Sequence, residues 1–273
     1  MSASRWPGWL WGVGAALVLG VPAGSACQGT PPEPPEPPVE RPPALGASSR
    51  VLLIGNSLTG ANNLAEMVEA MADSAGLSWE VEALIAGGGS IEDHWYRTGT
   101  HELIQNGRWD AVVLQQGPSS LPESRAHLRH WAAVFDEEIR AAGARTSLYM
   151  VWPESNRLDA FDRVRDSYAL AAVDVDGRFL PAGEAWRAAW RRDPAAPLYG
   201  LDGFHPTAVG SYTAALAIHA GLTDRSPVGL PATLTRSNGD TLVSVPPSLA
   251  GLLQAAAAEA AAAYRNYRPA DLP

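Results

Sequence analysis

From Arg50 onward, short apolar runs alternate with longer segments of helical periodicity, and this alternation limits the possible fold more than any other feature. The expected strands cover 51–54, 79–85, 110–115, 146–151 and 178–181. The expected helices cover 62–75, 100–105, 123–142, 159–172, 207–220 and 249–264. Helices between successive strands imply right-handed crossovers and a parallel sheet that is covered on both faces. The sequence therefore predicts an α/β fold with a parallel sheet of about five strands.

The N-terminus has the features of an export signal. Arg5 precedes an apolar stretch, 9–21, which is too short to span a bilayer comfortably. The small residues 24–26 follow, and a signal peptidase recognises small residues at this position. We therefore expect a signal peptide over 1–26 and an exported protein, either held at the cell envelope or released as a secreted or periplasmic one.

Cys27 is the only cysteine in the chain, so it has no internal disulfide partner. Its place directly after the expected cleavage site resembles the lipobox of bacterial lipoproteins, in which the cysteine is acylated. Gly24 stands where a lipobox usually carries an aliphatic residue. Two alternatives follow: a lipoprotein anchored through Cys27, and ordinary secretion in which Cys27 has no role.

Residues 27–48 contain repeated Pro-Pro-Glu units and little that could enter a hydrophobic core. Such a composition favours extended polyproline II conformation and acts as a semi-rigid spacer. We expect a linker over 27–48, followed by the folded domain over 49–273, with a helical extension at its C-terminal end.

The charge of the chain excludes one class of partner. The formal net charge is -9, and arginine supplies all the positive charge of the side chains at neutral pH, because the chain has no lysine. An acidic protein of this kind is a poor binder of the phosphate backbone of nucleic acids. We expect a small-molecule or glycan substrate, no nucleic acid, and membrane contact only through a lipid anchor at Cys27.

Three side chains far apart in the sequence suit nucleophilic catalysis. Ser57 follows the first expected strand, where parallel sheets collect their functional groups. Asp202 and His205 lie three residues apart near the other end of the chain. A serine hydroxyl needs a base to take its proton, and that base needs a third group to fix its tautomer. The order Ser, Asp, His therefore predicts a hydrolase, with Thr207 as a candidate cap of the next helix.

The motifs around these residues resemble the SGNH/GDSL hydrolases. Gly55-Asn56-Ser57-Leu58 matches the first block of that family with Asn in place of Asp, and Asp202-Gly-Phe-His205-Pro matches the last block. The likeness covers about 50–221. It implies a flavodoxin-like three-layer α/β/α sandwich that hydrolyses carboxylic esters, O-acetyl esters among them, through an acyl-enzyme, with Ser57, His205 and Asp202 as catalytic residues and with no cofactor or metal.

The resemblance also implies donors for an oxyanion hole. The backbone N–H of Ser57 is one candidate, and Gly88 in the glycine-rich loop after the second strand is another. The third family block normally supplies an Asn, but none is present there. A glutamine amide donates the same kind of hydrogen bond, which favours Gln115 and leaves Gln116 and Ser119 as alternatives.

Three further residues follow strands at the same edge of the expected sheet, and we expect them on the substrate rim: His94, Trp95 and Trp152. His127 and His130 share a helix face, but no Cys, Asp or Glu cluster completes a metal site with them. A different class of function remains open: a non-catalytic flavodoxin-like or glycan-binding module, which would leave Asp202 and His205 without a role.

Overall fold

The computed structural model describes residues 41–97 and 99–270. The expected signal peptide over 1–26, Cys27 and the linker residues up to 40 lie outside the described part. The strands are β1 (Ser48–Gly55), β2 (Ser78–Ile85), β3 (Ala111–Leu114), β4 (Arg145–Tyr149), β5 (Arg178–Leu180), β6 (Thr233–Thr235) and β7 (Thr241–Ser244). The α-helices are α1 (Ser57–Gly60), α2 (Leu64–Ser74), α3 (Ile91–Trp95), α4 (Thr100–Asn106), α5 (Pro122–Ala141), α6 (Phe161–Asp174), α7 (Ala182–Arg192), α8 (Ala208–Thr223) and α9 (Pro247–Tyr264). Two short 3₁₀ turns cover Ala61–Asn63 and Leu158–Ala160.

Five strands form one parallel sheet in the order β2-β1-β3-β4-β5. The chain runs from β1 to β2 on one side and then crosses to β3 on the other side, so its direction of travel reverses at β1. Ligands of open α/β sheets bind outside the carboxyl ends of the strands at such a switch point. The expected α/β class and the parallel five-stranded sheet are confirmed, and Ser57 directly follows the strand at the switch point.

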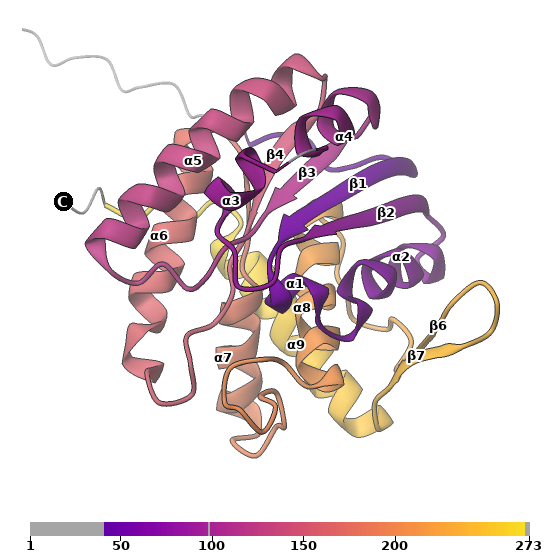
Figure 1. Ribbon diagram of the computed structural model, residues 1–273. Helices are drawn as coiled ribbons and strands as arrows, with labels where there is room; N and C mark the ends of the chain where they lie inside the picture. Colours follow the sequence, from indigo (N-terminus) through magenta and orange to yellow (C-terminus); the bar gives the residue numbers. More distant parts are fainter. Residues whose placement is uncertain (1–40, 98, 271–273) are drawn as a thin grey trace, which may run out of the picture. The chain divides into compact units, whose positions relative to one another are not determined.

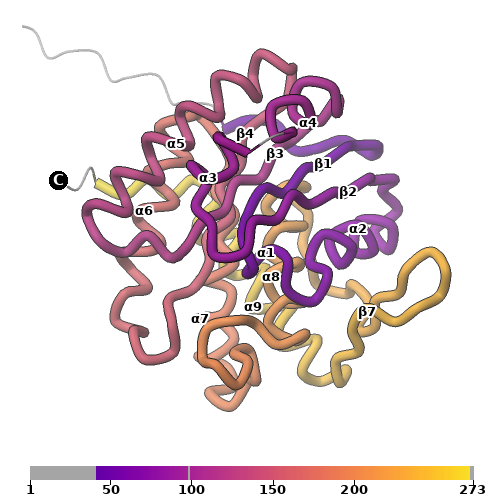
Figure 2. Tube along the Cα trace, in the orientation of Figure 1, coloured from indigo at the N-terminus to yellow at the C-terminus, as the bar shows by residue number. Residues whose placement is uncertain are grey.

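Helices cover both faces of the sheet, which makes three layers (Figure 1). On one face α2 and α8 pack against each other, with α7 and α9 against α8. On the other face α5 packs against α6 and β4, and α3 and α4 pack against α5. The trace in Figure 2 shows the β1 and β2 segments side by side, with α2 next to β2 and β3 on the far side of β1.

The centre of the core is the apolar run 51–54 of β1. All four of its side chains are fully buried, because helices cover both faces of a central parallel strand. β3 is buried along its whole length in the same way. A continuous apolar run therefore marks each central strand, whereas β2 at the sheet edge alternates buried and exposed residues over its first half.

The sequence-based boundaries agree with the structure for the five sheet strands and for the six expected helices. The sequence-based elements did not include the one-turn helix α1, the helices α3 and α7, or the antiparallel β6–β7 hairpin. α7 buries Ala185, Trp186 and Ala189 at helical spacing, so its periodicity was a usable signal. The expected C-terminal helical extension is the alanine-rich helix α9, which packs against α7 and α8.

The last residues of the expected linker belong to the folded unit. The Leu45 N–H donates to the carbonyl of Leu222 at 2.9 Å, and the Pro43 carbonyl accepts from Arg145 at 2.9 Å. Arg41 forms an ion pair with Asp224 at the end of α8. The chain is therefore fixed to the domain before β1 begins, because these bonds hold it beside β4 and α8.

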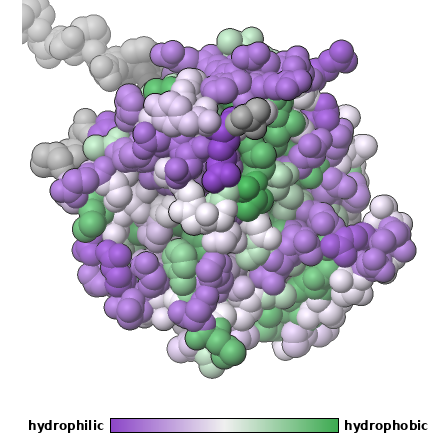
Figure 3. Space-filling view, viewed as in Figure 1, coloured by the Kyte–Doolittle hydropathy of each residue, from purple (hydrophilic) through white to green (hydrophobic). Residues whose placement is uncertain are grey.

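Within the described residues, no helix is both long and apolar enough to cross a membrane. On the face shown in Figure 3, apolar side chains are interspersed among hydrophilic ones.

One buried titratable group makes the fold sensitive to acid. His219 of α8 is fully buried beside Trp79 of β2, and both of its ring nitrogens lack a hydrogen-bond partner within the described structure. Burial, helped by the charge of Arg225, lowers the pKa of His219 to about 4. The native state therefore holds a neutral imidazole, whereas the unfolded chain takes up a proton near pH 6.5.

Because the unfolded state binds this proton more readily, the free energy of unfolding should fall as pH drops from about 6.5 to about 4. The expected slope from His219 is about 1.4 kcal/mol per pH unit. His219→Leu should remove this contribution. As pH falls from about 6.5 to about 4, the variant should therefore lose less unfolding free energy than wild type. Urea denaturation at several pH values measures it. A difference that stays constant with pH would contradict the assignment.

Candidate active site

The nucleophile turn, residues 55–59, begins at the last residue of β1 and leads directly into α1. The side chain of Asn56 caps α1, since its Oδ1 accepts from the Leu58 N–H at 3.0 Å. A side chain on Gly55 would meet Thr59 Oγ1 at 2.3 Å and Gln115 Oε1 at 2.4 Å. Glycine is therefore required before the cap, and Ser57 is placed half-buried at the first position of α1.

A second loop, residues 198–207, brings an aspartate and a histidine to the same edge of the sheet. Gly200 N–H donates to the His205 carbonyl at 2.7 Å, and the Gly203 N–H donates back to the Gly200 carbonyl at 3.0 Å. Gly203 has φ +70°, which favours glycine. Thr207 caps α8 by accepting from the Gly210 N–H at 3.1 Å, as expected from the sequence.

Contacts from the loop after β4 hold the 198–207 loop in place. The Ser155 N–H donates to the Gly203 carbonyl at 2.8 Å, and Trp152 Nε1 donates to the Phe204 carbonyl at 3.0 Å. On the other side, Asn62 Nδ2 donates to the Pro206 carbonyl at 3.0 Å. The backbone on both sides of His205 is thereby fixed from two directions.

Ser57, His205 and Asp202 form one hydrogen-bonded array. Ser57 Oγ lies 2.9 Å from His205 Nε2, and His205 Nδ1 lies 2.6 Å from Asp202 Oδ2. A carboxylate only accepts hydrogen bonds, so Nδ1 carries a proton and Nε2 can accept one from the serine hydroxyl. The side chains of His205 and Asp202 are 42% and 53% exposed, so the array is open to solvent.

The Asp202 carboxylate is well supplied with donors. Its Oδ1 accepts from the backbone N–H groups of Phe204 and His205, both at 3.0 Å. The hydrogen bond from the Phe204 N–H, followed by that from the His205 ring, lowers the pKa of Asp202 to about 2. Asp202 is therefore ionised at any pH at which the protein works.

The glycine-rich loop after β2 lies against the nucleophile turn. The Ala86 N–H donates to the Gly55 carbonyl at 2.9 Å, and the Gly89 N–H closes a tight turn onto the Ala86 carbonyl at 2.9 Å. Gly88 has φ +67° and lies between them. Within the described residues, the N–H of Gly88 has no backbone or side-chain acceptor, so it is available to a ligand.

Gln115 contacts the nucleophile turn through its oxygen. Its Oε1 accepts from the Asn56 N–H at 3.0 Å and from Thr59 Oγ1 at 2.6 Å, while its Nε2 donates to the Gln116 carbonyl. Gln116 Nε2 donates to Ser119 Oγ at 2.8 Å, and that hydroxyl donates to a backbone carbonyl. The expected third oxyanion donor thus uses its amide to brace the turn, and both alternatives, Gln116 and Ser119, bond to their own loop.

The predicted substrate rim needs correction. His94 and Trp152 are fully buried, so neither side chain lines an open rim. Helix α3 turns His94 inward, where its Nε2 lies 2.9 Å from the Gly55 carbonyl, and burial lowers its pKa. Trp152 stacks on Trp186 with ring centroids 3.5 Å apart and 10° between the ring planes. Trp95 is half-buried and packs edge-on against Phe135 of α5.

Three residues that no sequence motif marks also support the site: Ser155, Asn62 and Trp186. Ser155 and Asn62 act through a backbone N–H and a side-chain amide, and neither leaves a motif. Asn62 stands in the left-handed region at φ 55°, which an Asn adopts more readily than most residues.

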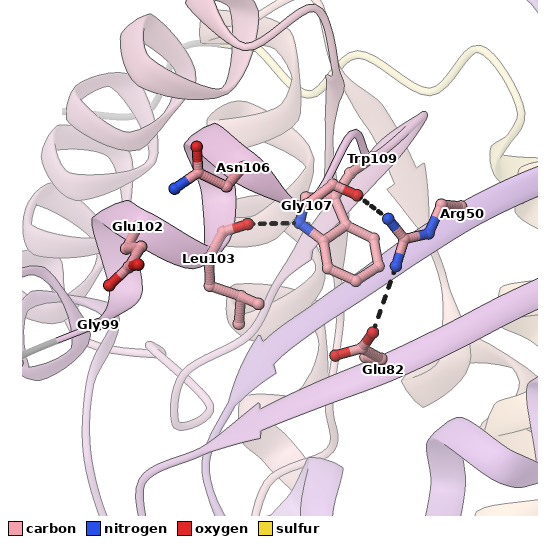
Figure 4. A pocket seen from close by; sticks show the side chains of 8 residues that line it. All are labelled: Arg50, Glu82, Gly99, Glu102, Leu103, Asn106, Gly107 and Trp109. Atoms are coloured by element: carbon pink, nitrogen blue, oxygen red, sulfur yellow. Dashed lines mark hydrogen bonds and ion pairs between the residues drawn. The ribbon is translucent and has the colours of Figure 1, made fainter.

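The described structure also has a cavity of about 440 Å³ between α4 and the amino-terminal half of β1 (Figure 4). Its cation, Arg50, stacks over Trp109 and pairs with Glu80 and Glu82. Arg50 lies seven residues before Ser57, or roughly 20 Å along an extended strand. This cavity is therefore distinct from the serine array.

No cluster of three or more potential metal ligands occurs among residues 41–97 and 99–270, and His127 pairs with Glu92 instead.

No protein-family model and no curated protein matches this sequence. Solved structures do. A structure described as "a putative SGNH hydrolase from Slackia heliotrinireducens" is 28% identical, with TM-score 0.55, and the match covers 64% of this chain and 98% of that one. A DUF4886 family protein from Bacteroides uniformis is 19% identical, with TM-score 0.65, over 81% of this chain and 97% of that one. TesA is 15% identical, with TM-score 0.51, over 64% of this chain and 98% of that one.

These likenesses confirm an SGNH/GDSL-like fold for this chain, in the three-layer α/β/α form expected from the sequence. The 28% identical structure also supports a hydrolase.

The bracing role of Gln115 can be tested by its effect on stability. Gln115→Leu keeps the volume but leaves the buried Asn56 N–H and Thr59 hydroxyl without their acceptor. Each such donor costs about 1–3 kcal/mol, so the free energy of unfolding should fall by about 2–6 kcal/mol. Urea denaturation measures the loss.

The double variant Gln115→Leu/Thr59→Val is the matched control, because it removes one of the two orphaned donors. It should be less destabilised than the sum of the two single variants. Strict additivity would mean that the two side chains do not interact.

Proposed function

On this fold and with this side-chain geometry, we propose that the protein is a serine hydrolase that cleaves carboxylic esters through an acyl-enzyme. The observation that carries the proposal is the continuous chain of hydrogen bonds from Ser57 through His205 to Asp202. A glycan- or flavin-binding module would have no need for a serine, a base and an orienting carboxylate in line, so the hydrolase is favoured over the binding module.

In the first half-reaction, Ser57 Oγ attacks the acyl carbon as His205 Nε2 takes the hydroxyl proton. Asp202 accepts from Nδ1–H throughout, which keeps the ring in the productive tautomer and stabilises the imidazolium. The imidazolium then passes its proton to the oxygen of the leaving alcohol as the ester C–O bond breaks. The acyl group remains on Ser57.

The second half-reaction repeats these steps with water. His205 takes a proton from a water molecule that attacks the acyl carbon, and the proton returns to Ser57 Oγ as the acid is released. Water can reach the acyl-enzyme, since His205 and Asp202 are partly exposed.

Negative charge develops on the carbonyl oxygen in both half-reactions, and fixed N–H donors stabilise it. We assign this role to the backbone N–H groups of Ser57 and Gly88. Asn56 caps the N–H groups of Leu58 and Thr59 through its side chain and carbonyl, which leaves the Ser57 N–H as the uncapped donor at the start of α1. Gln115 supports this arrangement through Asn56. The proposed substrates are O-acyl esters, with O-acetyl groups on glycans as the first class to test.

Ser57→Ala should abolish the hydrolysis of p-nitrophenyl acetate and leave the melting temperature within a few degrees of wild type, because Ser57 is only half-buried and the change removes a single hydroxyl. Ser74→Ala, at the end of α2, serves as the matched serine control and should keep full activity. Turnover by the Ser57 variant at the wild-type rate would end the serine hydrolase proposal.

Asp202→Asn should lower kcat by on the order of 10²–10⁴, because the amide no longer holds the His205 tautomer. Since the pKa of Asp202 is lowered to about 2, its carboxylate is ionised across the working range. Protonation of Asp202 itself should therefore not limit wild-type kcat between pH 4 and pH 8. A kcat of the Asp202→Asn variant equal to that of wild type at neutral pH would contradict the role of Asp202.

A further inference from the structure

Asn56 occupies the position at which this chain departs from the first block of the SGNH/GDSL pattern. The residue is buried, and its side chain makes two hydrogen bonds of different kinds. Its Oδ1 accepts from the Leu58 N–H at 3.0 Å, which caps α1. Its Nδ2 donates to the Gly89 carbonyl at 3.2 Å, which reaches across to the glycine-rich loop. An aspartate could make the first bond but not the second, because an ionised carboxylate has no N–H.

The bond to Gly89 completes a set that joins the loop to the nucleophile turn. Gly55 carbonyl accepts from the Ala86 N–H and lies within hydrogen-bond distance of His94 Nε2, each at 2.9 Å. These two contacts hold the start of the loop and the helix that follows it. Between them, the loop closes on itself through the Gly89 N–H and the Ala86 carbonyl, and within the described residues Asn56 is what ties this part to the nucleophile turn.

We propose that Asn56 is a positioning residue that fixes the glycine-rich loop so that the Gly88 N–H points at the oxyanion formed on Ser57. This inference rests on the proposed esterase mechanism and adds a residue to it. Gly88 faces open space on its Cα side, since a Cβ built there would meet no atom within 4 Å. The Nδ2 bond holds the carbonyl of the next residue, Gly89, and thereby restrains the turn that carries the Gly88 N–H.

A purely structural role for Asn56, that of helix cap, predicts something different. Asp and Ser are N-caps about as good as Asn. If capping were the whole role, Asn56→Asp and Asn56→Ser would leave catalysis unchanged. If the Nδ2 bond positions the Gly88 N–H, catalysis should suffer in both variants. Each variant keeps the cap on α1 but loses the Nδ2 bond to the Gly89 carbonyl.

The experiment compares Asn56→Asp and Asn56→Ser with wild type on p-nitrophenyl acetate. Both variants should lower kcat about 10- to 100-fold, which is no more than the effect of removing one oxyanion donor outright. KM should stay within about twofold of the wild-type value. The melting temperature should stay near that of wild type. The neutral serine variant separates loss of the donor from the new charge of the aspartate. Wild-type kcat in both variants, or a loss of kcat in the aspartate variant alone, would overturn the proposal.

Gly88→Ala supplies the coupling test. The new methyl has space, but φ +67° strains an alanine and disturbs the same loop. If Asn56 acts through this loop, the double variant Gly88→Ala/Asn56→Ser should lose much less activity than the product of the two single losses. Multiplicative losses would overturn the proposal. Ser57→Ala in the same assay separates the two hypotheses. If Ser57→Ala is active, the hydrolase proposal fails. If it is inactive and the Asn56 variants are unimpaired, only the positioning role fails.

Discussion

Everything at the candidate site depends on the close approach of two side chains, Gln115 and Thr59, to the backbone of Gly55 at the carboxyl end of β1. Gly55 has no side chain, and this absence lets the Gln115 amide and the Thr59 hydroxyl reach the turn that carries Ser57. Any side chain at this position would place its Cβ 2.3 Å from Thr59 Oγ1 and 2.4 Å from Gln115 Oε1, so the turn would have to shift. Because β1 lies between β2 and β3, the same point also receives the glycine-rich loop from one side and the Gln115 loop from the other.

The histidine and the aspartate reach that point from a loop with no regular structure, so their placement depends on outside supports. Trp152 is the main one: its indole N–H holds the Phe204 carbonyl, and its ring is stacked on Trp186 of α7. Two large aromatic rings in a fully buried stack leave little freedom to the backbone that they hold. A core contact thus sets the position of His205, although the histidine itself is partly exposed.

The exposure of Asp202 has a consequence for how the array is oriented. Burial would disfavour the charged form of a carboxylate, whereas this one is about half exposed and is oriented by two backbone N–H groups. Those donors belong to residues 204 and 205 of the same loop, so Asp202 and His205 move as one body. The three-residue offset in the sequence is what makes this possible.

The sequence by itself determined the five parallel strands, the helices between them and the array of Ser57, Asp202 and His205, because apolar periodicity and short motifs are local properties. It identified neither the partners of Gln115 nor the inward turn of His94. A glutamine amide offers both a donor and an acceptor, and a histidine ring points either way, so only the neighbours brought up by folding choose between the options. The tertiary structure alone decided that Gln115 braces the nucleophile turn through its oxygen, that Trp152 supports His205 from within the core, and that Asn56 reaches the glycine-rich loop. Each of these contacts joins residues that are at least thirty positions apart in the sequence. Each also depends on which atom of a side chain faces the site. The periodicity of the chain carries no information on either point.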